Sequence, residues 1–266
     1  ELNVNLDGVE VIDPAKEAND DYINTYYELR KHKGIDKNFA AEQMKKVNFY
    51  GAMLVEKGEV AGMVGGLTSA TKPFIPAFEI VKTKPGLTKA SSAFFMIRDE
   101  LVFIYADCAM NINPDKEVLA QIGAASGDTA KAFGIEPKIA FLSFSTNGTA
   151  TDALVDKVNE ATKIAKKLRP QYAIDGEMQF DCALLADVAA KKWADSPVAG
   201  KANVFVFPDL NAGNIGYKIT ERLGGFKAVG PIFQGLNKPV NDLSRGAKPE
   251  DVADTGYLTA VQSMVD

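Results

Sequence analysis

Short apolar runs alternate along the chain with segments whose apolar residues recur every three or four positions. Residues 138–145 (KIAFLSFS) are an apolar run that ends in small polar residues, as is typical of a buried strand. In residues 149–171 (TATDALVDKVNEATKIAKKLRPQ), Ala, Leu, Val and Ile have the spacing of an amphipathic helix. Residues 172–185 (YAIDGEMQFDCALL) begin as a strand and continue as a helix.

The clearest unit is 203–225 (NVFVFPDLNAGNIGYKITERLGG). A buried strand meets Pro208, passes a polar loop, and enters a helix that stops at Gly224-Gly225. This alternation predicts an α/β fold with mainly parallel sheets, in which ligands bind at the carboxyl ends of the strands. Small and polar residues crowd the loops expected there, so we expect one polar crevice. These loops are 105–111, 144–149, 174–179, 207–214 and 241–246.

Two stretches that mix Lys, Pro and polar residues predict crossings between two α/β domains. They are KTKPGLTKASS at 82–92 and LNKPVND at 236–242. We therefore expect a discontinuous first domain, residues 1–89 plus 244–266, closed by the C-terminal helix. Residues 90–243 would form the second domain, with a cleft between the two. A length of 266 residues is comfortable for two domains.

Composition narrows the range of possible partners, cofactors and locations. A net charge of −5 argues against nucleic acid or an anionic membrane as the main partner. No apolar run reaches the length of a membrane span. The two cysteines have no short spacing, and the chain has one histidine, so we expect neither a disulfide framework nor a zinc site. A reducing cytoplasm is the default location, and no G-x-G-x-x-G or P-loop string occurs.

The stretch PVNDLSRGAKPEDV at 239–252 supports two interpretations. In one, Pro249 is the first residue of a helix whose positive end favours the acids Glu250 and Asp251. That helix would bury a face of Val252, Leu258, Val261 and Val265. In the other, hydroxyl, guanidinium and carboxylate groups hold a phosphoryl group beside a proton acceptor.

Two further motifs are equally open. The cations of YELRKHKG at 27–34 can form a solvated face or bind an anion, and the lone His32 among lysines should be exposed. Asn211, Gly213 and Asn214 can be an ordinary helix cap and turn, or a backbone amide cradle for phosphate. Cys108 and Cys182 are interpreted as buried apolar residues rather than nucleophiles.

Taken together, FPDLNAGNIGYKI, DSPVAGKANVF, IDGEMQFD, YYELRKHKGI and KPVNDLSRG resemble the phosphate acetyltransferase (phosphotransacetylase) family over almost the full length. The resemblance implies a two-domain α/β enzyme, commonly a homodimer, with its active site in the interdomain cleft. Such an enzyme interconverts acetyl-CoA and phosphate with acetyl phosphate and coenzyme A. It needs no metal or bound prosthetic group, since coenzyme A is a substrate. The family chain normally begins with a further strand and helix, so the first domain is expected to be truncated.

The resemblance aligns Ser244, Arg245 and Asp251 with the family's catalytic group. Arg245 would bind phosphate oxygens through its planar fork, Ser244 would stabilise the developing oxyanion, and Asp251 would accept the thiol proton. The expected substrate-binding residues are Arg30, Asn211, Asn214 and Asn241.

One departure keeps alternatives open. Ile75 stands where the family usually has an arginine expected to bind substrate phosphate, with Lys72 nearby. A Lys does not reproduce the bidentate geometry of an Arg. The alternatives are a phosphate butyryltransferase and a non-catalytic acetyl-CoA-binding regulatory domain like that fused to malic enzymes.

Overall fold

The structure is a computed structural model that describes residues 7–17, 19–66, 79–243 and 246–264, and the structural statements below concern these residues. The helices are α1 (Asp20–Arg30), η1 (Lys31–Lys33), α2 (Lys37–Met44), α3 (Val47–Lys57), α5 (Lys116–Ala132), α6 (Ala153–Leu168), α7 (Phe180–Leu184), α8 (Ala186–Lys192), α9 (Leu210–Arg222) and α10 (Pro249–Ser263). The strands are β1 (Met63–Gly65), β2 (Ser91–Arg98), β3 (Leu101–Ala106), β4 (Lys138–Leu142), β5 (Ala173–Met178), β6 (Val204–Val206), β7 (Lys227–Gln234) and β8 (Val240–Asp242).

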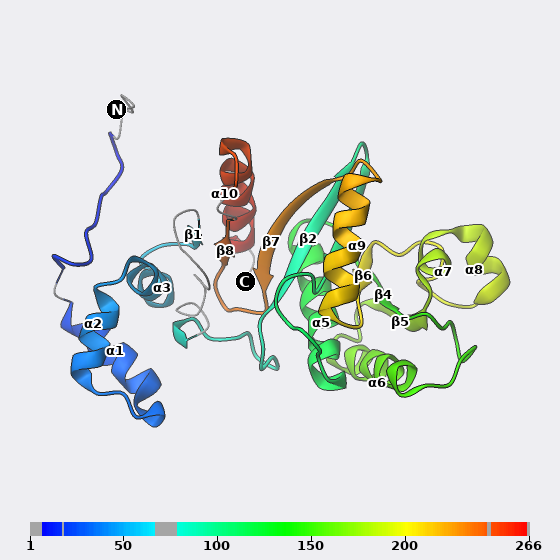
Figure 1. Cartoon of the computed structure of the whole chain (residues 1–266), viewed down its shortest axis with the longest axis horizontal. Coiled ribbons are helices and arrows are strands. Elements are labelled where there is room, and N and C mark those ends of the chain that lie inside the picture. Colours follow the sequence, from blue (N-terminus) through cyan, green and yellow to red (C-terminus); the bar gives the residue numbers. More distant parts are fainter. Residues whose placement is uncertain (1–6, 18, 67–78, 244–245, 265–266) are drawn as a thin grey trace.

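A six-stranded sheet with the order β5-β4-β6-β3-β2-β7 is the scaffold of the larger part of the molecule (Figure 1). β4 is parallel to β5 and β6, and β6 is parallel to β3. β2 is antiparallel to β3 and β7. The parallel strands β3 to β6 therefore bring their carboxyl ends to one edge, where α/β folds bind ligands.

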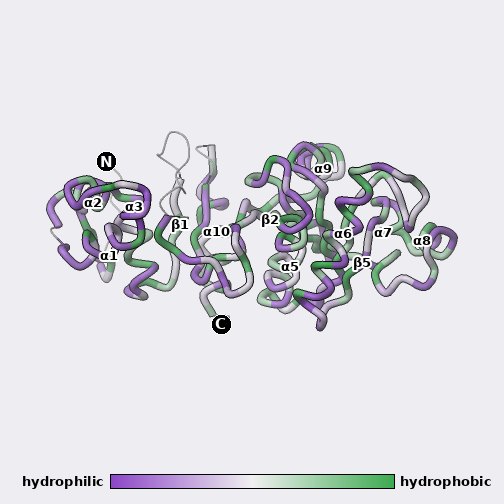
Figure 2. The backbone as a smooth tube through the Cα atoms, turned by 90° about the horizontal axis from the view of Figure 1, so that it is seen from below, coloured by the Kyte–Doolittle hydropathy of each residue, from purple (hydrophilic) through white to green (hydrophobic). Residues whose placement is uncertain are grey.

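Alternate residues of the strands feed two hydrophobic layers, one on each face of this sheet. In β6, Val204 and Val206 join one layer and Phe205 joins the other. The first layer includes residues of α5 and α6, and the second includes residues of α7, α8 and α9. Figure 2 shows the hydrophobic stretches of the larger part gathered between these helices. A strand buried on both faces reads as a continuous apolar run, which explains the pattern at 138–142 and 204–207.

The smaller part consists of α1, α2 and α3 beside a two-stranded parallel sheet of β1 and β8, with α10 packed against β1, β7 and β8 (Figure 1). Its core gathers aromatic and aliphatic side chains of the three helices around Ile80, which is 1% exposed. The buried members are Tyr22, Tyr26, Ala40, Met44, Tyr50, Ala52, Met53 and Ile80.

Short polar side chains set the helix starts. The Asp209 side chain accepts a hydrogen bond from the Ala212 backbone N–H at 2.9 Å and begins α9. Asp115 and Asp152 cap α5 and α6 in the same way. Such caps satisfy backbone donors that have no partner inside the helix.

The α/β architecture with mostly parallel strand pairing is confirmed, and the helix at 249 begins at Pro249 as predicted. The predicted buried face of α10 is wrong in part. Its buried residues are Thr255 and Thr259, whereas Val252, Leu258 and Val261 are only partly buried, and Val265 lies outside the described residues. A polar neighbour explains this, because the Thr259 hydroxyl accepts a hydrogen bond from a buried asparagine amide of β8.

The proposed domain division stays a prediction, but its expected boundary at residue 243 can be compared with the strand pairing. β8, at residues 240–242, pairs with β1 rather than with the six-stranded sheet. The chain therefore returns to the smaller sheet between β7 and β8, a few residues before the expected boundary at 243.

Candidate active site

Asp251 lies in the first turn of α10. Its Oδ2 accepts a hydrogen bond from the Lys248 backbone N–H at 2.8 Å, which holds the carboxylate at the positive end of the helix. The side chain also borders a cavity. The geometry is therefore compatible with both interpretations, the helix start and the proton acceptor, because the helix start fixes the carboxylate while the side chain still borders the cavity.

The cavity beside Asp251 has a volume of about 290 Å³ and lies between α10, α9, β2 and β7. One wall is Phe94 stacked on Tyr217, with ring centroids 4.3 Å apart. Burial raises the pKa of Tyr217 above its usual range, so the phenol stays protonated. We call this the Asp251 cavity. Its lining residues are Phe94, Tyr217, Glu221, Arg222, Ala228, Val229, Gly230, Pro231, Leu243, Gly246, Ala247, Asp251 and Thr255.

Ser244 and Arg245 lie outside the described residues, as do Ile75 and Lys72. The residues on either side of the pair, Leu243 and Gly246, both line the Asp251 cavity. The chain therefore enters and leaves the predicted catalytic pair at the cavity that Asp251 borders.

Asn241 is fully buried at the centre of a hydrogen-bond network. Its Oδ1 accepts from the Phe233 backbone N–H at 2.7 Å, and its Nδ2 donates to Thr259 Oγ1 at 2.8 Å and Gln262 Oε1 at 2.6 Å. The amide thus joins β7, β8 and α10. Its side-chain oxygen and nitrogen are thus engaged within the protein, and the expected substrate-binding role of Asn241 stays a prediction.

Asp242, the last residue of β8, belongs to the polar stretch 241–246, but the sequence analysis gave it no role of its own. Its Oδ1 is buried without a hydrogen-bond partner among the described residues. Burial raises the pKa of this carboxyl from 3.8 to about 6, against a smaller lowering by the Leu243 backbone N–H. The carboxylate packs on Gly66, which has φ +109°, and a Cβ there would stand 2.0 Å from Oδ1. Its place as the second residue of NDLSRG is the sequence signal that could have pointed to it.

Arg30 is the last residue of α1, and its Nη2 donates to Glu79 Oε1 at 3.1 Å. The Tyr26 hydroxyl donates to the other oxygen of Glu79 at 2.6 Å. His32 is exposed in the following turn, as expected. Arg30 is therefore not simply part of a solvated face, because an acid from a distant segment holds it.

A second cavity, of about 510 Å³, opens beside Glu79, and we call it the Glu79 cavity. Residues of both expected domains line it, as they line the Asp251 cavity, but the two cavities share no lining residue. Arg30 and Asp251 were expected in one crevice; the two cavities are lined by different described residues, and Arg30 is in neither lining, so that expectation stays a prediction. The lining residues are Leu29, Glu79, Ile80, Val81, Lys82, Thr83, Thr88, Lys89, Ala90, Met110, Asn111 and Leu236.

Asn211 and Asn214 lie inside the first turns of α9, because Asp209 is the N-cap. Asn211 is exposed. The Asn214 Nδ2 donates to the Cys108 carbonyl oxygen at 3.0 Å, and its Oδ1 accepts from Lys218 Nζ at 2.6 Å. Asn214 thus ties α9 to the loop 107–111, whose Met110 and Asn111 line the Glu79 cavity.

Asp107 organises that loop. It is 3% exposed and accepts hydrogen bonds from the Ser92 hydroxyl, from three backbone N–H groups at 3.0–3.1 Å, and from the Asn111 amide at 2.6 Å. Sequence reasoning marked YADCAMN as a polar strand end but gave Asp107 no role. Cys108 and Cys182 are both buried free thiols, as expected, and burial raises the pKa of both.

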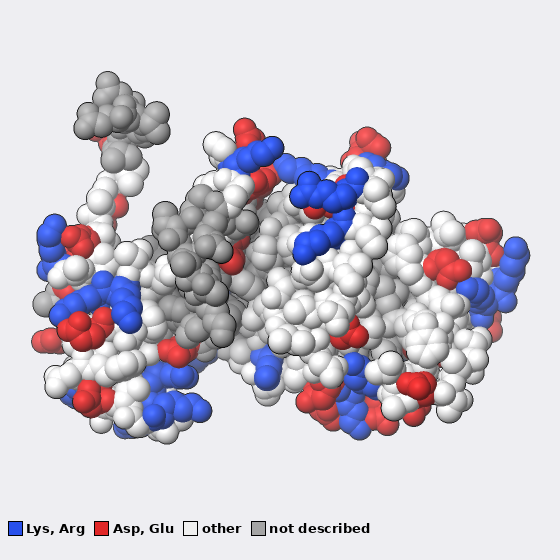
Figure 3. All heavy atoms as spheres, in the orientation of Figure 1, with Lys and Arg blue, Asp and Glu red and all other residues white. Residues whose placement is uncertain are grey.

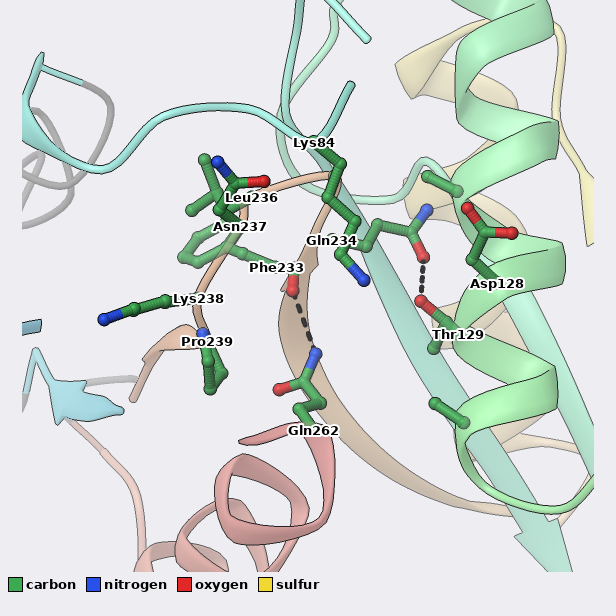
Figure 4. A pocket seen from close by; sticks show the side chains of 13 residues that line it. Lys84, Asp128, Thr129, Phe233, Gln234, Leu236, Asn237, Lys238, Pro239 and Gln262 are labelled. Carbon is green, nitrogen blue, oxygen red and sulfur yellow. Dashed lines mark hydrogen bonds between the residues drawn. The ribbon is translucent and has the colours of Figure 1, made fainter. Parts of the chain in front are cut away.

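Figure 4 shows a third hollow, between the β7–β8 connection, α5 and α10. Thr129 Oγ1 donates to Gln234 Oε1 at 3.0 Å, and Gln262 Nε2 donates to the Phe233 carbonyl at 3.0 Å. Its volume is about 50 Å³. Ligand pockets are usually ~300 Å³ or larger, so this hollow is too small for a substrate, and the Asp251 and Glu79 cavities remain the candidates.

Three further features of the described residues concern possible metal, membrane and charged partners. They contain no group of three or more His, Cys, Asp or Glu side chains placed to hold a metal ion. None of the helices within them is both long and apolar enough to cross a membrane. On the face drawn in Figure 3, acidic and basic side chains are interspersed.

Known proteins resemble this chain over nearly its whole length. The model of the phosphate acetyl/butaryl transferase family matches residues 1–260. A phosphate acetyltransferase of Bacillus subtilis is 49% identical over 99% of this chain and 82% of its own length. Another, of Nitratidesulfovibrio vulgaris, is 44% identical, and the chain spans 38% of it. The solved EutD phosphotransacetylase of Staphylococcus aureus matches 98% of this chain and 81% of its own, with 45% identity and a TM-score of 0.92.

Proposed function

The chain belongs to the phosphate acetyl/butaryl transferase family, and from that premise we propose that it interconverts acetyl-CoA and phosphate with acetyl phosphate and coenzyme A. The observation that carries the proposal is the placement of Asp251. A helix start holds this acid at the rim of a 290 Å³ cavity bordered by the residues that flank Ser244 and Arg245.

The proposed reaction is direct transfer in a ternary complex. Asp251 takes the proton of the coenzyme A thiol, the thiolate attacks the acetyl carbonyl, and the bond between that carbon and the phosphate oxygen breaks. Arg245 binds the phosphate as it leaves. Ser244 donates a hydrogen bond to the carbonyl oxygen while that oxygen carries negative charge. Holding both substrates together supplies much of the rate.

The proton transfer needs help from the site. The pKa of an ordinary carboxyl lies ~4.6 below that of a thiol, so the proton transfer is uphill by roughly 6 kcal/mol. Cations near the thiol, or desolvation of the acid, close part of this gap. Arg222 is the cation among the described residues that line the Asp251 cavity.

For Arg30 we propose binding of a phosphate group carried by a substrate. Glu79, which holds Arg30, lines the Glu79 cavity, and the bound phosphate has two possible sources with the same chemistry, acetyl phosphate and coenzyme A. The KM values of an Arg30→Ala variant for the two substrates distinguish them. Asn211 and Asn214 would support this side of the cleft, and Asn241 would position the catalytic loop.

The decisive experiment is an assay for coenzyme A-dependent consumption of acetyl phosphate. The same assay with butyryl phosphate tests the butyryltransferase alternative. Binding of acetyl-CoA without turnover would instead favour the regulatory domain that Ile75 keeps open. We propose that no metal or resident prosthetic group takes part, so EDTA should leave the rate unchanged. An EDTA-sensitive rate restored by a divalent ion would contradict this.

We also propose a homodimer that acts in the cytoplasm. Free cysteine thiols support a reducing compartment. The dimer is supported by exposed apolar side chains on one face of α9, Ile215, Ile219 and Leu223, of which Ile219 and Leu223 border an apolar hollow of about 380 Å³. Light scattering of the parent and of Ile219→Glu tests it, and a monomeric parent would refute it.

A further inference from the structure

Tyr26, Glu79 and Arg30 form a short chain of contacts between two segments far apart in sequence. The Tyr26 hydroxyl donates to Glu79 Oε2 at 2.6 Å, and Arg30 Nη2 donates to Glu79 Oε1 at 3.1 Å. Tyr26 and Arg30 are one helical turn apart on α1, so both can meet one carboxylate. The acid therefore fixes the direction of the arginine relative to the helix.

Glu79 itself stands on a rigid base. The next two residues, Ile80 and Val81, are 1% and 3% exposed, and Ile80 packs into the aromatic core of α1 and α3. Tyr26 belongs to the same core and is 2% exposed. Burial, reinforced by Glu79, raises the pKa of Tyr26, so the phenol remains a hydrogen-bond donor at physiological pH.

A similar trio elsewhere in the molecule shows what a purely structural version looks like. Asp128 accepts from Arg169 Nε at 2.8 Å and Nη2 at 2.6 Å, and from the Tyr172 hydroxyl at 3.0 Å. The arginine side chains are similarly covered, with 19% exposure for Arg169 and 25% for Arg30. The two trios differ in how many nitrogens of the arginine bind the carboxylate, because Asp128 binds two nitrogens of Arg169.

Glu79 holds Arg30 by one nitrogen. A guanidinium carries five N–H donors in a fixed fork, so most of the donors of Arg30 remain for an anion. Glu79 and Leu29, the neighbour of Arg30, line the 510 Å³ Glu79 cavity, together with Lys82 and Lys89. The pair thus combines an oriented arginine with room for a ligand and further positive charge.

We propose that Glu79 is a positioning residue that orients Arg30 toward a phosphate group of the substrate bound in the Glu79 cavity. The inference rests on the proposed function for the identity of the substrates. Glu79 borders the cavity, but its negative charge would repel a phosphate, so its proposed role is to hold the guanidinium in one direction and lower the entropy cost of binding.

The competing explanation is an ordinary partly exposed ion pair, which stabilises the fold slightly and does nothing else. It predicts that loss of Glu79 changes stability without changing the affinity for one substrate in particular. The two explanations therefore separate in the pattern of KM values rather than in the melting temperature.

The test measures kcat and KM for acetyl phosphate and for coenzyme A in the parent, Arg30→Ala, Glu79→Ala, Glu79→Gln and the double alanine variant. Arg30→Ala identifies which substrate carries the bound phosphate. Glu79→Ala should raise the KM for that same substrate about tenfold and leave the other KM unchanged. Glu79→Gln keeps an oxygen acceptor for Arg30 and should recover most of the loss. In the Arg30→Ala background, Glu79→Ala should add no more than about twofold.

Asp128→Ala is the matched control, since it breaks the similar trio and should lower the melting temperature without moving either KM. The inference is overturned if Arg30→Ala changes neither KM, if Glu79→Ala leaves the identified KM unchanged, or if its effect is the same with and without Arg30. If the parent shows no coenzyme A-dependent turnover, the proposed function fails. The inference is then judged by Kd values for coenzyme A and acetyl phosphate in the same variants.

Discussion

The loops at the ends of β3 and β8 each contain an aspartate, and the two carboxylates have opposite surroundings. Asp107, directly after β3, is 3% exposed and accepts five hydrogen bonds. Asp242, the last residue of β8, keeps a buried Oδ1 without a partner, and its pKa is raised to about 6. One charge is fully compensated and the other is not.

The difference separates scaffold from candidate chemistry. Donors around Asp107 recover the cost of burying its charge and fix the loop 107–111 in one shape. Within the part of the chain that the structure describes, no comparable set of donors surrounds Asp242, which stands two and three residues before Ser244 and Arg245. Unfavourable electrostatics concentrate at functional sites because position there matters more than stability. We therefore expect substitutions near β3 to cost stability and substitutions near β8 and α10 to cost activity.

Asp251→Asn should have the largest effect and should act on activity. Loss of a general base typically costs about 100- to 10,000-fold in rate, or roughly 3–5 kcal/mol of barrier. The asparagine keeps a polar group at the helix start and loses a dipole contribution of only ~0.3–1 kcal/mol. The measurement is turnover from neutral to alkaline pH, alongside the melting temperature and coenzyme A binding.

The deficit of Asp251→Asn should shrink at high pH, where coenzyme A ionises without assistance. Glu250→Gln, the neighbouring acid in the same turn, is the control and should keep near-parental turnover. A folded Asp251→Asn protein with turnover within about threefold of the parent at neutral pH would leave Asp251 as a helix cap only.

Asp107→Ala should have the next largest effect and should act on stability. It leaves several buried donors without an acceptor, which costs about 3 kcal/mol or more. Asp107→Asn should lose nearly as much, because its amide offers one acceptor oxygen and turns N–H groups toward other N–H donors. Urea denaturation measures both. An Asp107→Asn protein as stable as the parent would show that the charge in this loop is dispensable.

Much of the fold could be predicted because the strands are buried on both faces and the helices carry regular apolar spacing. The elements at 138–142, 153–168 and 204–222 follow directly from those two periods. The buried face of α10 could not be predicted, because Thr255 and Thr259 are buried through contacts with β7 and β8 that no local pattern encodes.

The candidate site could be predicted only in part for the same reason. Asp251 was identified from its motif, and its helix-start geometry follows from local sequence. The partnership of Arg30 with Glu79 spans 49 residues. Of the five donors around Asp107, the Ser92 hydroxyl comes from β2, which pairs with β3, whereas the other four come from residues 109–111. Asn241, the first residue of NDLSRG, was expected to bind substrate, which stays a prediction; its hydrogen bonds to β7 and α10 are long-range contacts that the motif does not encode.

Asp242→Asn should have the smallest effect on stability, and that effect should be a gain. The folded protein binds the Asp242 proton more tightly than the unfolded chain does, because burial raises the pKa from 3.8 to about 6. Below the unfolded pKa both states are protonated, and nothing is lost. As pH rises toward 6 the unfolded chain gives up its proton first, so the free energy of unfolding falls, and above 6 the loss is constant. Asparagine escapes this loss, and its amide oxygen can take the unpartnered position. Solvent screens the partly exposed side chain, so we expect a gain of roughly 1 kcal/mol above pH 6 that fades toward pH 4. Urea denaturation of the parent and of Asp242→Asn across this pH range measures the gain in the free energy of unfolding, with Asp187→Asn at the exposed start of α8 as the control. A variant no more stable than the parent at pH 8, or a gain that grows toward acid, would show that the carboxylate has a partner in solution and would remove the contrast with Asp107.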